Sequence, residues 1–208
     1  MSEPARLFDV DRFMTVNTSN ESWSSETVTS QGMMKPDLPP TTFHPAMLED
    51  QRLLVDCSRQ TTRRSGPGGQ HRNKTETAVV LTHIPTGIRA EANESRSQAQ
   101  NLKSALFRLR QSIAEQVRQS VETHAPPSEL WRSRASRRKI TVSTEHADFP
   151  SLLAEALDRV VVHEFDLAAA AAPLNVSTTQ LIRFLQQSPR AWQWINSERS
   201  TRLLRPLR

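Results

Sequence analysis

The chain has 208 residues, of which 36% are hydrophobic and 24% are charged, and this suits one ordinary domain or two small ones. No apolar run approaches the roughly 20 residues of a membrane helix, and the amino terminus lacks the basic start and apolar stretch of a secretory signal. Cys57 is the single cysteine, so the sequence excludes an intramolecular disulfide or a cysteine metal cluster and fits a reducing cytoplasm.

Positive charge is concentrated in the middle of the chain. Residues 45–140 hold 17 basic and 9 acidic residues, residues 1–44 hold 3 and 6, and residues 141–208 hold 7 and 7. Most of the basic residues are Arg, whose planar guanidinium suits phosphate groups. The pattern favours a polyanionic partner, with nucleic acid first, although a solvated face on a soluble domain is the alternative.

Residues 1–44 are rich in Ser, Thr, Asn and Pro and show no hydrophobic periodicity, so we expect a disordered N-terminal extension. A first folded unit is expected over residues 45–121. Its predicted elements are a short helix over 45–53, a strand over 54–60, a loop over 62–74, and strands over 78–82 and 88–92 joined by a turn at Pro85-Thr86-Gly87.

After Ser97 the apolar residues recur at spacings of three and four, which predicts a long amphipathic helix that ends at residues 124–127. A basic stretch headed by Trp131 follows, and residues 122–149 are expected to form a basic linker. The apolar stripe of the predicted helix consists of Leu102, Leu106, Leu109, Ile113 and Val117.

Residues 150–208 are expected to form a small all-helical domain. The complete chain is therefore predicted to be α+β, with a small mixed α/β domain, in which a β-hairpin sheet packs on a long helix, followed by the helical domain. The signals that start its four helices are the apolar face from Leu152, the cap Asp166, the capping-box pair Ser177 and Gln180, and Ser188-Pro189.

The chemistry-bearing string is a glycine-rich loop, Ser65-Gly66-Pro67-Gly68-Gly69-Gln70. Its glycines permit backbone angles that other residues avoid, and they let the backbone approach a substrate without a Cβ in the way. Gln70 adds a backbone N–H and a side-chain amide, and cations flank the loop on both sides. The composition therefore predicts a loop that positions a phosphate-bearing substrate and a water molecule.

A conventional catalytic constellation is missing from the sequence. It contains no Ser-His-Asp pattern, no paired carboxylates near the loop and no metal-ligand spacing, so no cofactor or metal is expected. His71 and His83 are available as bases, but single histidines are more often surface or packing residues.

Residues 63–101 closely resemble the catalytic domain of class I peptide chain release factors and of the related ribosome-rescue peptidyl-tRNA hydrolases. The resemblance rests on the glycine loop, the Asn73-Lys74 pair, the turn at residues 82–87 and the Glu94–Gln98 run that opens the long helix. It implies that residues 45–121 are a peptidyl-tRNA hydrolase domain whose catalytic residues are Gly68, Gly69 and Gln70.

The resemblance also implies a mechanism and partners. The loop is expected to enter the peptidyl transferase centre of the large ribosomal subunit, where the Gln70 N–H stabilises developing negative charge as an oxyanion hole does. The Gln70 side chain would help to place the attacking water. Ribosomal RNA and peptidyl-tRNA are the expected partners in the cytoplasm, with neither a membrane nor specific DNA involved.

The resemblance and the charge pattern together give a set of candidate RNA-binding residues. Asn73 and Lys74 alternatively cap and flank a short helix, Arg96 alternatively starts the long helix, and the stretch from Trp131 to Lys139 alternatively forms a solvated linker. The candidates are Arg64, Arg72, Asn73, Lys74, Arg96, Arg132, Arg134, Arg137, Arg138 and Lys139.

Only 44 low-complexity residues precede the first folded unit, so the resemblance predicts release without direct codon reading, as in ribosome rescue, and leaves room for a codon- or stall-recognising partner. Residues 166–185 resemble a helix-turn-helix with Asn175 at the turn, but residues 141–208 carry no net charge, which favours RNA or protein docking over DNA reading. A purely structural helical bundle is the equal alternative for this unit. The alternatives are a non-catalytic ribosome- or RNA-binding protein and a DNA-binding regulator.

Overall fold

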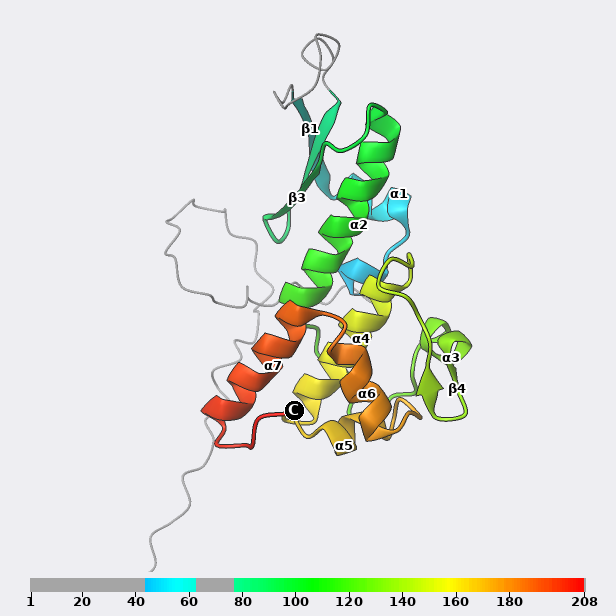
Figure 1. Ribbon diagram of the computed structural model, residues 1–208, viewed down its shortest axis with the longest axis vertical. Helices are drawn as coiled ribbons and strands as arrows, with labels where there is room; N and C mark the ends of the chain where they lie inside the picture. Colours follow the sequence, from blue (N-terminus) through cyan, green and yellow to red (C-terminus); the bar gives the residue numbers. More distant parts are fainter. Residues whose placement is uncertain (1–43, 63–76, 208) are drawn as a thin grey trace, which may run out of the picture. The chain divides into compact units, whose positions relative to one another are not determined.

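The computed structural model describes residues 44–62 and 77–207 of the chain. The predicted extension up to residue 43 and the glycine loop lie outside these ranges. The described residues form a mixed α/β fold with a three-stranded antiparallel sheet, a separate short hairpin and several helices (Figure 1). The predicted α+β class is confirmed.

The sheet has the order β1-β2-β3, formed by Cys57–Thr62, Ala78–His83 and Ile88–Ala92. β2 lies in the centre and is almost entirely buried, as its β-branched and apolar sequence requires. The strands predicted over 78–82 and 88–92 are confirmed. β1 begins three residues later than predicted, because Asp50–Val55 forms the short helix α1 after a 3-10 turn, η2, at Pro45–Met47.

The β2–β3 hairpin turn is formed as expected at Gly87. This residue has a φ of 63°, a left-handed value that suits glycine, and its N–H donates to the His83 carbonyl at 2.7 Å. Thr86 Oγ1 lies 2.8 Å from His83 Nδ1 and accepts the N–H of Ile88 at 3.3 Å. Side chains and backbone together therefore fix the turn.

The long helix α2 spans Gln98–Gln116 and is capped by Ser97, whose side chain accepts the N–H of Gln100. Its apolar stripe packs on β2 and β3. The helix ends earlier than predicted, well before residues 124–127, because Val117 adopts an extended backbone. Arg118 then folds back and donates to the Ala114 carbonyl at 2.5 Å, which satisfies one of the acceptors left at the helix end.

The segment expected to be a basic linker contains regular structure. Glu129–Arg134 forms helix α3, and Ala135–Ser136 and Lys139–Ile140 form the antiparallel strands β4 and β5. Trp131, at the head of the basic stretch, is fully buried. Residues 129–140 are therefore not an irregular linker, since the tryptophan side chain docks this part onto the core.

The last third of the described chain is helical, as predicted. The predicted caps Asp166, Ser177 and Ser188 accept backbone N–H groups at the starts of their helices, and Asn175 adopts the expected left-handed φ of 52°. The four helices are α4 (Phe149–Val162), α5 (Leu167–Ala171), α6 (Thr178–Leu185) and α7 (Pro189–Thr201).

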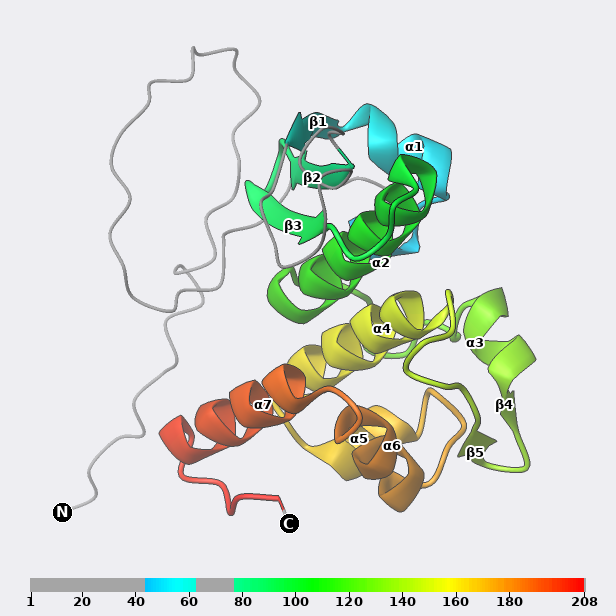
Figure 2. The same ribbon diagram turned by 45° about the horizontal axis from the view of Figure 1, so that its top comes forward.

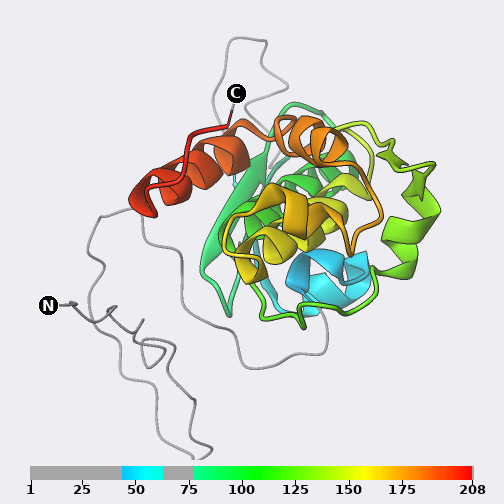
Figure 3. The same cartoon turned by 90° about the horizontal axis from the view of Figure 1, so that it is seen from below.

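The hydrophobic core runs without interruption from the sheet into these helices. α4 packs against α2 and η2 (Figures 2 and 3), and one cluster of buried residues includes Leu109 and Ile113 of α2, Leu152 and Leu157 of α4, and Leu181 of α6. The domain boundaries at 45–121 and 150–208 stay a prediction, but the residues on either side of them share this core.

Within residues 44–62 and 77–207, no helix combines the length and apolarity that crossing a bilayer requires. The same residues contain no group of three or more His, Cys, Asp or Glu side chains placed to hold a metal ion.

Candidate active site

The two ends of the glycine loop are held next to each other by the sheet. Thr62, the last residue of β1, pairs with Ala78, the first residue of β2. The two residues from which this segment starts and ends thus lie on adjacent antiparallel strands, at the same end of the sheet. Figure 1 shows the sheet and α2. The catalytic candidates and four of the RNA-binding candidates, Arg64, Arg72, Asn73 and Lys74, lie outside the described residues.

The residue before β2 is anchored by a buried asparagine of α2. The Asn101 side-chain Nδ2 donates to the Thr77 carbonyl at 2.7 Å and to the Ser95 carbonyl at 2.8 Å, and its Oδ1 accepts the Ser95 N–H at 2.8 Å. Only 1% of Asn101 is exposed. These three bonds tie the end of the glycine loop to the first turn of α2.

Asn101 was not singled out from the sequence, although a signal was present. It stands at spacing four before Ala105, which is followed at the same spacing by Leu109 and Ile113, all fully buried on α2. A polar residue at a core position needs hydrogen-bond partners. The position of Asn101 on the apolar stripe therefore indicates that its side chain makes buried hydrogen bonds.

Arg96 is the one predicted RNA-binding residue that the structure describes at the loop root. It follows Ser95, which Asn101 holds in place, and it is exposed. Nearby, Glu94 forms a 2.7 Å ion pair with Arg108, and the hydrogen bond from Arg108 lowers the pKa of Glu94. Arg108 also donates to the Glu91 carbonyl at 2.8 Å. The side chain of Arg96 thus stays available beside a loop root that other residues brace.

His83 does not offer a base to the loop. Only 1% of its surface is exposed, its Nδ1 contacts Thr86 Oγ1, and burial lowers its pKa although Asp56 acts in the opposite direction. His83 also pairs with Cys57 at the opposite end of β1 from Thr62. Its position makes it a turn residue of the β2–β3 hairpin.

In the structure, some cations of the basic stretch are paired with carboxylates and others are exposed. Arg134 donates to the Asp148 carboxylate at 2.5 and 2.9 Å, so its charge is largely neutralised. Arg132 is 3.7 Å from Glu129, a pair in which both side chains are mostly exposed and which therefore holds Arg132 weakly. Arg137, Arg138 and Lys139 are exposed at the tip of the β4–β5 hairpin. This hairpin and the loop root lie in different parts of the described fold (Figure 1).

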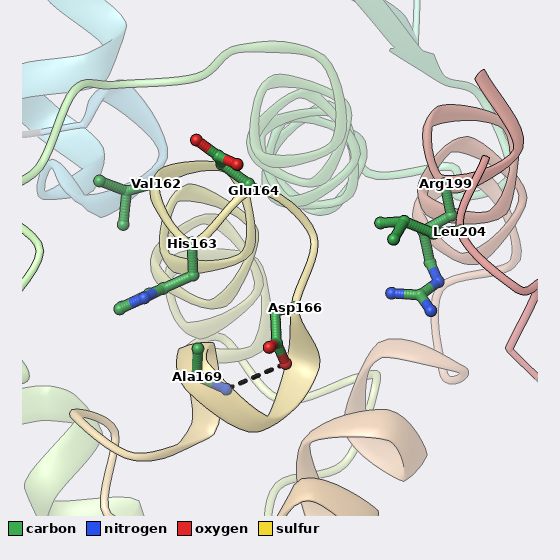
Figure 4. A pocket seen from close by; sticks show the side chains of 7 residues that line it. All are labelled: Val162, His163, Glu164, Asp166, Ala169, Arg199 and Leu204. Carbon is green, nitrogen blue, oxygen red and sulfur yellow. Dashed lines mark hydrogen bonds between the residues drawn. The ribbon is translucent and has the colours of Figure 1, made fainter. Parts of the chain in front are cut away.

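A surface hollow lies between α4, α5 and α7 (Figure 4). Two of its charged lining residues hold the chain in place. Asp166 caps α5 by accepting the N–H groups of Ala168 and Ala169, and Arg199 donates to the carbonyls of Phe165 and Arg205. His163 and Glu164 line the same hollow.

The comparisons with known proteins match the part of the chain that contains the loop root. Residues 54–147 match the family model of the RF-1 domain. The matched segment includes all three strands, α2, α3 and the β4–β5 hairpin. These residues form an RF-1 domain, and the chain is a class I release factor-like protein.

Its curated relatives include peptide chain release factor 1 of several bacteria. The chain is 38% identical over 97 residues to the Rickettsia typhi protein, 34% identical over 139 residues to the Rickettsia akari protein, and 46% identical over 71 residues to the Malacoplasma penetrans protein. These alignments cover 47%, 67% and 33% of this chain, but only 26%, 36% and 20% of the respective relatives. The chain thus spans about a third or less of the length of those relatives.

Proposed function

We propose that this protein hydrolyses the ester bond of peptidyl-tRNA on the ribosome through Gly68, Gly69 and Gln70. The observation that supports the proposal is the loop root: an RF-1 domain in which Thr62 and Ala78 pair and Asn101 clamps Thr77, so that both ends of the Gly-Gly-Gln segment start from a braced sheet. A fixed root limits the positions open to the loop before it meets its substrate, which favours catalysis by orientation.

In the proposed reaction a water oxygen attacks the ester carbonyl carbon of peptidyl-tRNA. The bond between this carbon and the tRNA 3′ oxygen then breaks. One proton of the water ends on the tRNA hydroxyl, and the other passes to solvent, so that the peptide leaves with a carboxylate. The backbone N–H of Gln70 stabilises the negative charge that develops in the transition state, and the Gln70 side chain helps to place the water. Ribosomal RNA and tRNA supply the remaining contacts in the cytoplasm.

We extend the proposal to codon-independent release of the ribosome-rescue type. On either side of residues 54–147, which match the RF-1 model, the sequence has the low-complexity residues 1–44 and a helical part with a helix-turn-helix-like segment. Neither carries a tripeptide-type motif for reading a stop codon. Arg64, Arg72, Asn73, Lys74 and Arg96 are the residues proposed to contact RNA around the loop.

The test is release of labelled formyl-methionine from ribosomes that carry initiator tRNA in the peptidyl site. The A site would be empty, or would hold a sense or a stop codon, and each complex would receive the wild type or Gln70→Ala. We expect release that is independent of the stop codon. Gln70→Ala keeps the backbone N–H but removes the side chain that places the water, so release by the variant should fall by roughly a hundredfold, the scale of misplacing a reacting group. Ribosome binding without release by the wild type would instead identify a non-catalytic binding protein.

A further inference from the structure

The tip of the β4–β5 hairpin carries two arginines in an unfavourable backbone conformation. Ser136 pairs with Lys139, so Arg137 and Arg138 form a two-residue turn, and their φ angles are 49° and 60°. Turns with positive φ at both central positions strongly prefer Asn-Gly. The left-handed conformation costs a residue with a Cβ roughly 1–2 kcal/mol, so the sequence keeps two cations where neutral residues would fold more easily.

The charges at this tip have no partner within the described part of the chain. Arg137, Arg138 and Lys139 are exposed and form no ion pair with another described residue, in contrast to Arg134 on the same segment, which pairs with Asp148. A residue strained at a position where its charge stays free points to a ligand outside the chain.

The tip is fixed against the helix-turn-helix-like segment rather than projecting freely. The N–H of Ser177, the N-cap of α6, donates to the Arg138 carbonyl at 3.0 Å. At the base of the hairpin, the Trp131 indole donates to the Leu174 carbonyl at 2.8 Å, and its ring meets the Phe184 ring edge-on at 5.8 Å. The tip and α6 therefore form one surface, as their adjacent positions in Figure 2 show.

This composite surface is basic. α6 adds the exposed Thr179 and Arg183, and Arg183 forms no ion pair with another described residue. The hairpin and α6 contain no acidic residue. Four exposed cations thus lie on two elements that backbone and aromatic contacts hold together, and two of these four are the strained arginines.

We propose that the hairpin tip and α6 bind the sugar-phosphate backbone of a ribosomal RNA helix and position the protein on the ribosome. The choice of RNA rests on the proposed function. Arg presents paired N–H donors that match phosphate oxygens, and backbone contacts of this kind fix orientation without reading sequence. The single Arg on α6 does not supply the set of base-edge contacts that sequence-specific DNA recognition requires.

The test replaces the strained turn by the residues that its backbone favours, Arg137→Asn together with Arg138→Gly. Because the carbonyl of residue 138 remains, the bond from Ser177 is kept, and we expect the unfolding midpoint to rise. Binding of the full chain to a 20-base-pair RNA duplex and to ribosomes, measured by fluorescence anisotropy and by sedimentation, should weaken roughly tenfold, and the slope of log K against log salt should fall by about 1.4–1.8. A variant that is stabilised and binds RNA as the wild type does would overturn the proposal.

The matched control is Arg52→Gln with Arg205→Gln, which removes the same charge from exposed positions on α1 and after α7. It should leave the RNA affinity within about twofold of the wild type, and an equal loss would show a mere effect of net charge. Equal or tighter binding to duplex DNA of the same sequence would overturn the assignment to RNA. At a ribosome concentration below saturation the turn variant should release more slowly than the wild type, whereas failure of the proposed hydrolysis would show as absent release by the wild type with RNA binding intact.

Discussion

The side-chain amide of Asn101 lies 2.7 Å from the backbone oxygen of Thr77, so the first turn of α2 holds the residue at which the glycine loop meets the sheet. The same amide group also fixes Ser95 through both its oxygen and its nitrogen. One buried side chain therefore sets the relative positions of the end of the loop, the start of β2 and the loop that carries Arg96.

Asn101→Ala should impair release more than ribosome binding. The change leaves the carbonyls of Thr77 and Ser95 and the Ser95 N–H without their partner and should cost about 1–3 kcal/mol in the free energy of unfolding. Loosening the loop root should lower kcat of formyl-methionine release severalfold, with the half-saturating ribosome concentration changed less than twofold. Single-turnover kinetics over a ribosome titration would measure both quantities.

Ser188→Ala is the matched control for this prediction. Ser188 is fully buried, caps α7 and donates to Glu115 at 2.8 Å, so its loss should destabilise the fold comparably without touching the loop root. If both variants lowered kcat equally, the effect of Asn101 would be one of stability alone.

His44 should make the fold sensitive to mild acid. Burial lowers its pKa from 6.5 to about 4, aided by the charge of Arg118, although the Val117 carbonyl opposes the shift. Its Nδ1 accepts the Ala46 N–H at 3.1 Å, so the ring nitrogen that would take the extra proton is already an acceptor. Because the folded pKa is depressed, the stability from neutral His44 is complete above pH 6.5 and is lost as pH falls toward 4.

The measurement is the difference in unfolding free energy between wild type and His44→Gln, whose amide can accept from Ala46 and donate to Val117 but does not titrate. Relative to this variant, the wild type should lose about 3 kcal/mol between pH 7 and pH 4. Taking the difference removes the contribution of Asp158, whose raised pKa acts in the opposite direction. Parallel pH profiles for the two proteins would contradict the prediction.

The Arg118–Asp158 pair should show strong coupling. The two side chains are 5% and 4% exposed and 3.4 Å apart, and burial raises the pKa of Asp158 to about 7 although Arg118 and the Gln119 N–H oppose this. At pH 8 Asp158→Leu should cost about 3–5 kcal/mol, because it leaves a buried guanidinium without its counter-ion. Denaturation of the two single variants and of Arg118→Met with Asp158→Leu would complete the cycle. Additive losses would show that the pair does not act as a unit.

Trp131→Phe should loosen the attachment of the β4–β5 hairpin. The smaller ring leaves a gap in the core and removes the donor that the Leu174 carbonyl uses, so the unfolding free energy should fall by about 2–4 kcal/mol. Denaturant titration gives the value, and amide hydrogen exchange at residues 135–140 should accelerate more than exchange in β2. An equal acceleration of exchange in residues 135–140 and in β2 would argue against a local attachment.

Local signals in the sequence predicted much of the fold. The β2–β3 hairpin was recognisable because β2 is rich in β-branched residues and the turn has Gly87 at a left-handed position. The caps Asp166, Ser177 and Ser188 marked helix starts because their side chains accept N–H groups two to three residues later, an interaction within a single turn.

Features that depend on distant residues were missed. α2 ends at Gln116 because Arg118 turns back toward Asp158, a contact across 40 positions that no local pattern shows. The β4–β5 hairpin escaped prediction because Arg137-Arg138 lacks the Asn-Gly signature of its turn. At the site, Gln70 was found through the family resemblance, whereas Asn101 and the commitment of Arg134 to Asp148 required three-dimensional contacts.

The shared core of α2 and α4 extends beyond the segment that matches the RF-1 model. The recognisable RF-1 segment stops at residue 147, yet α2 within it packs on α4, which begins at Phe149. A fragment that ended at residue 147 would lack α4 and would leave apolar surface of α2 facing water. A fragment that folds on its own is therefore expected to need the helices after residue 147 as well as the segment that matches the RF-1 model.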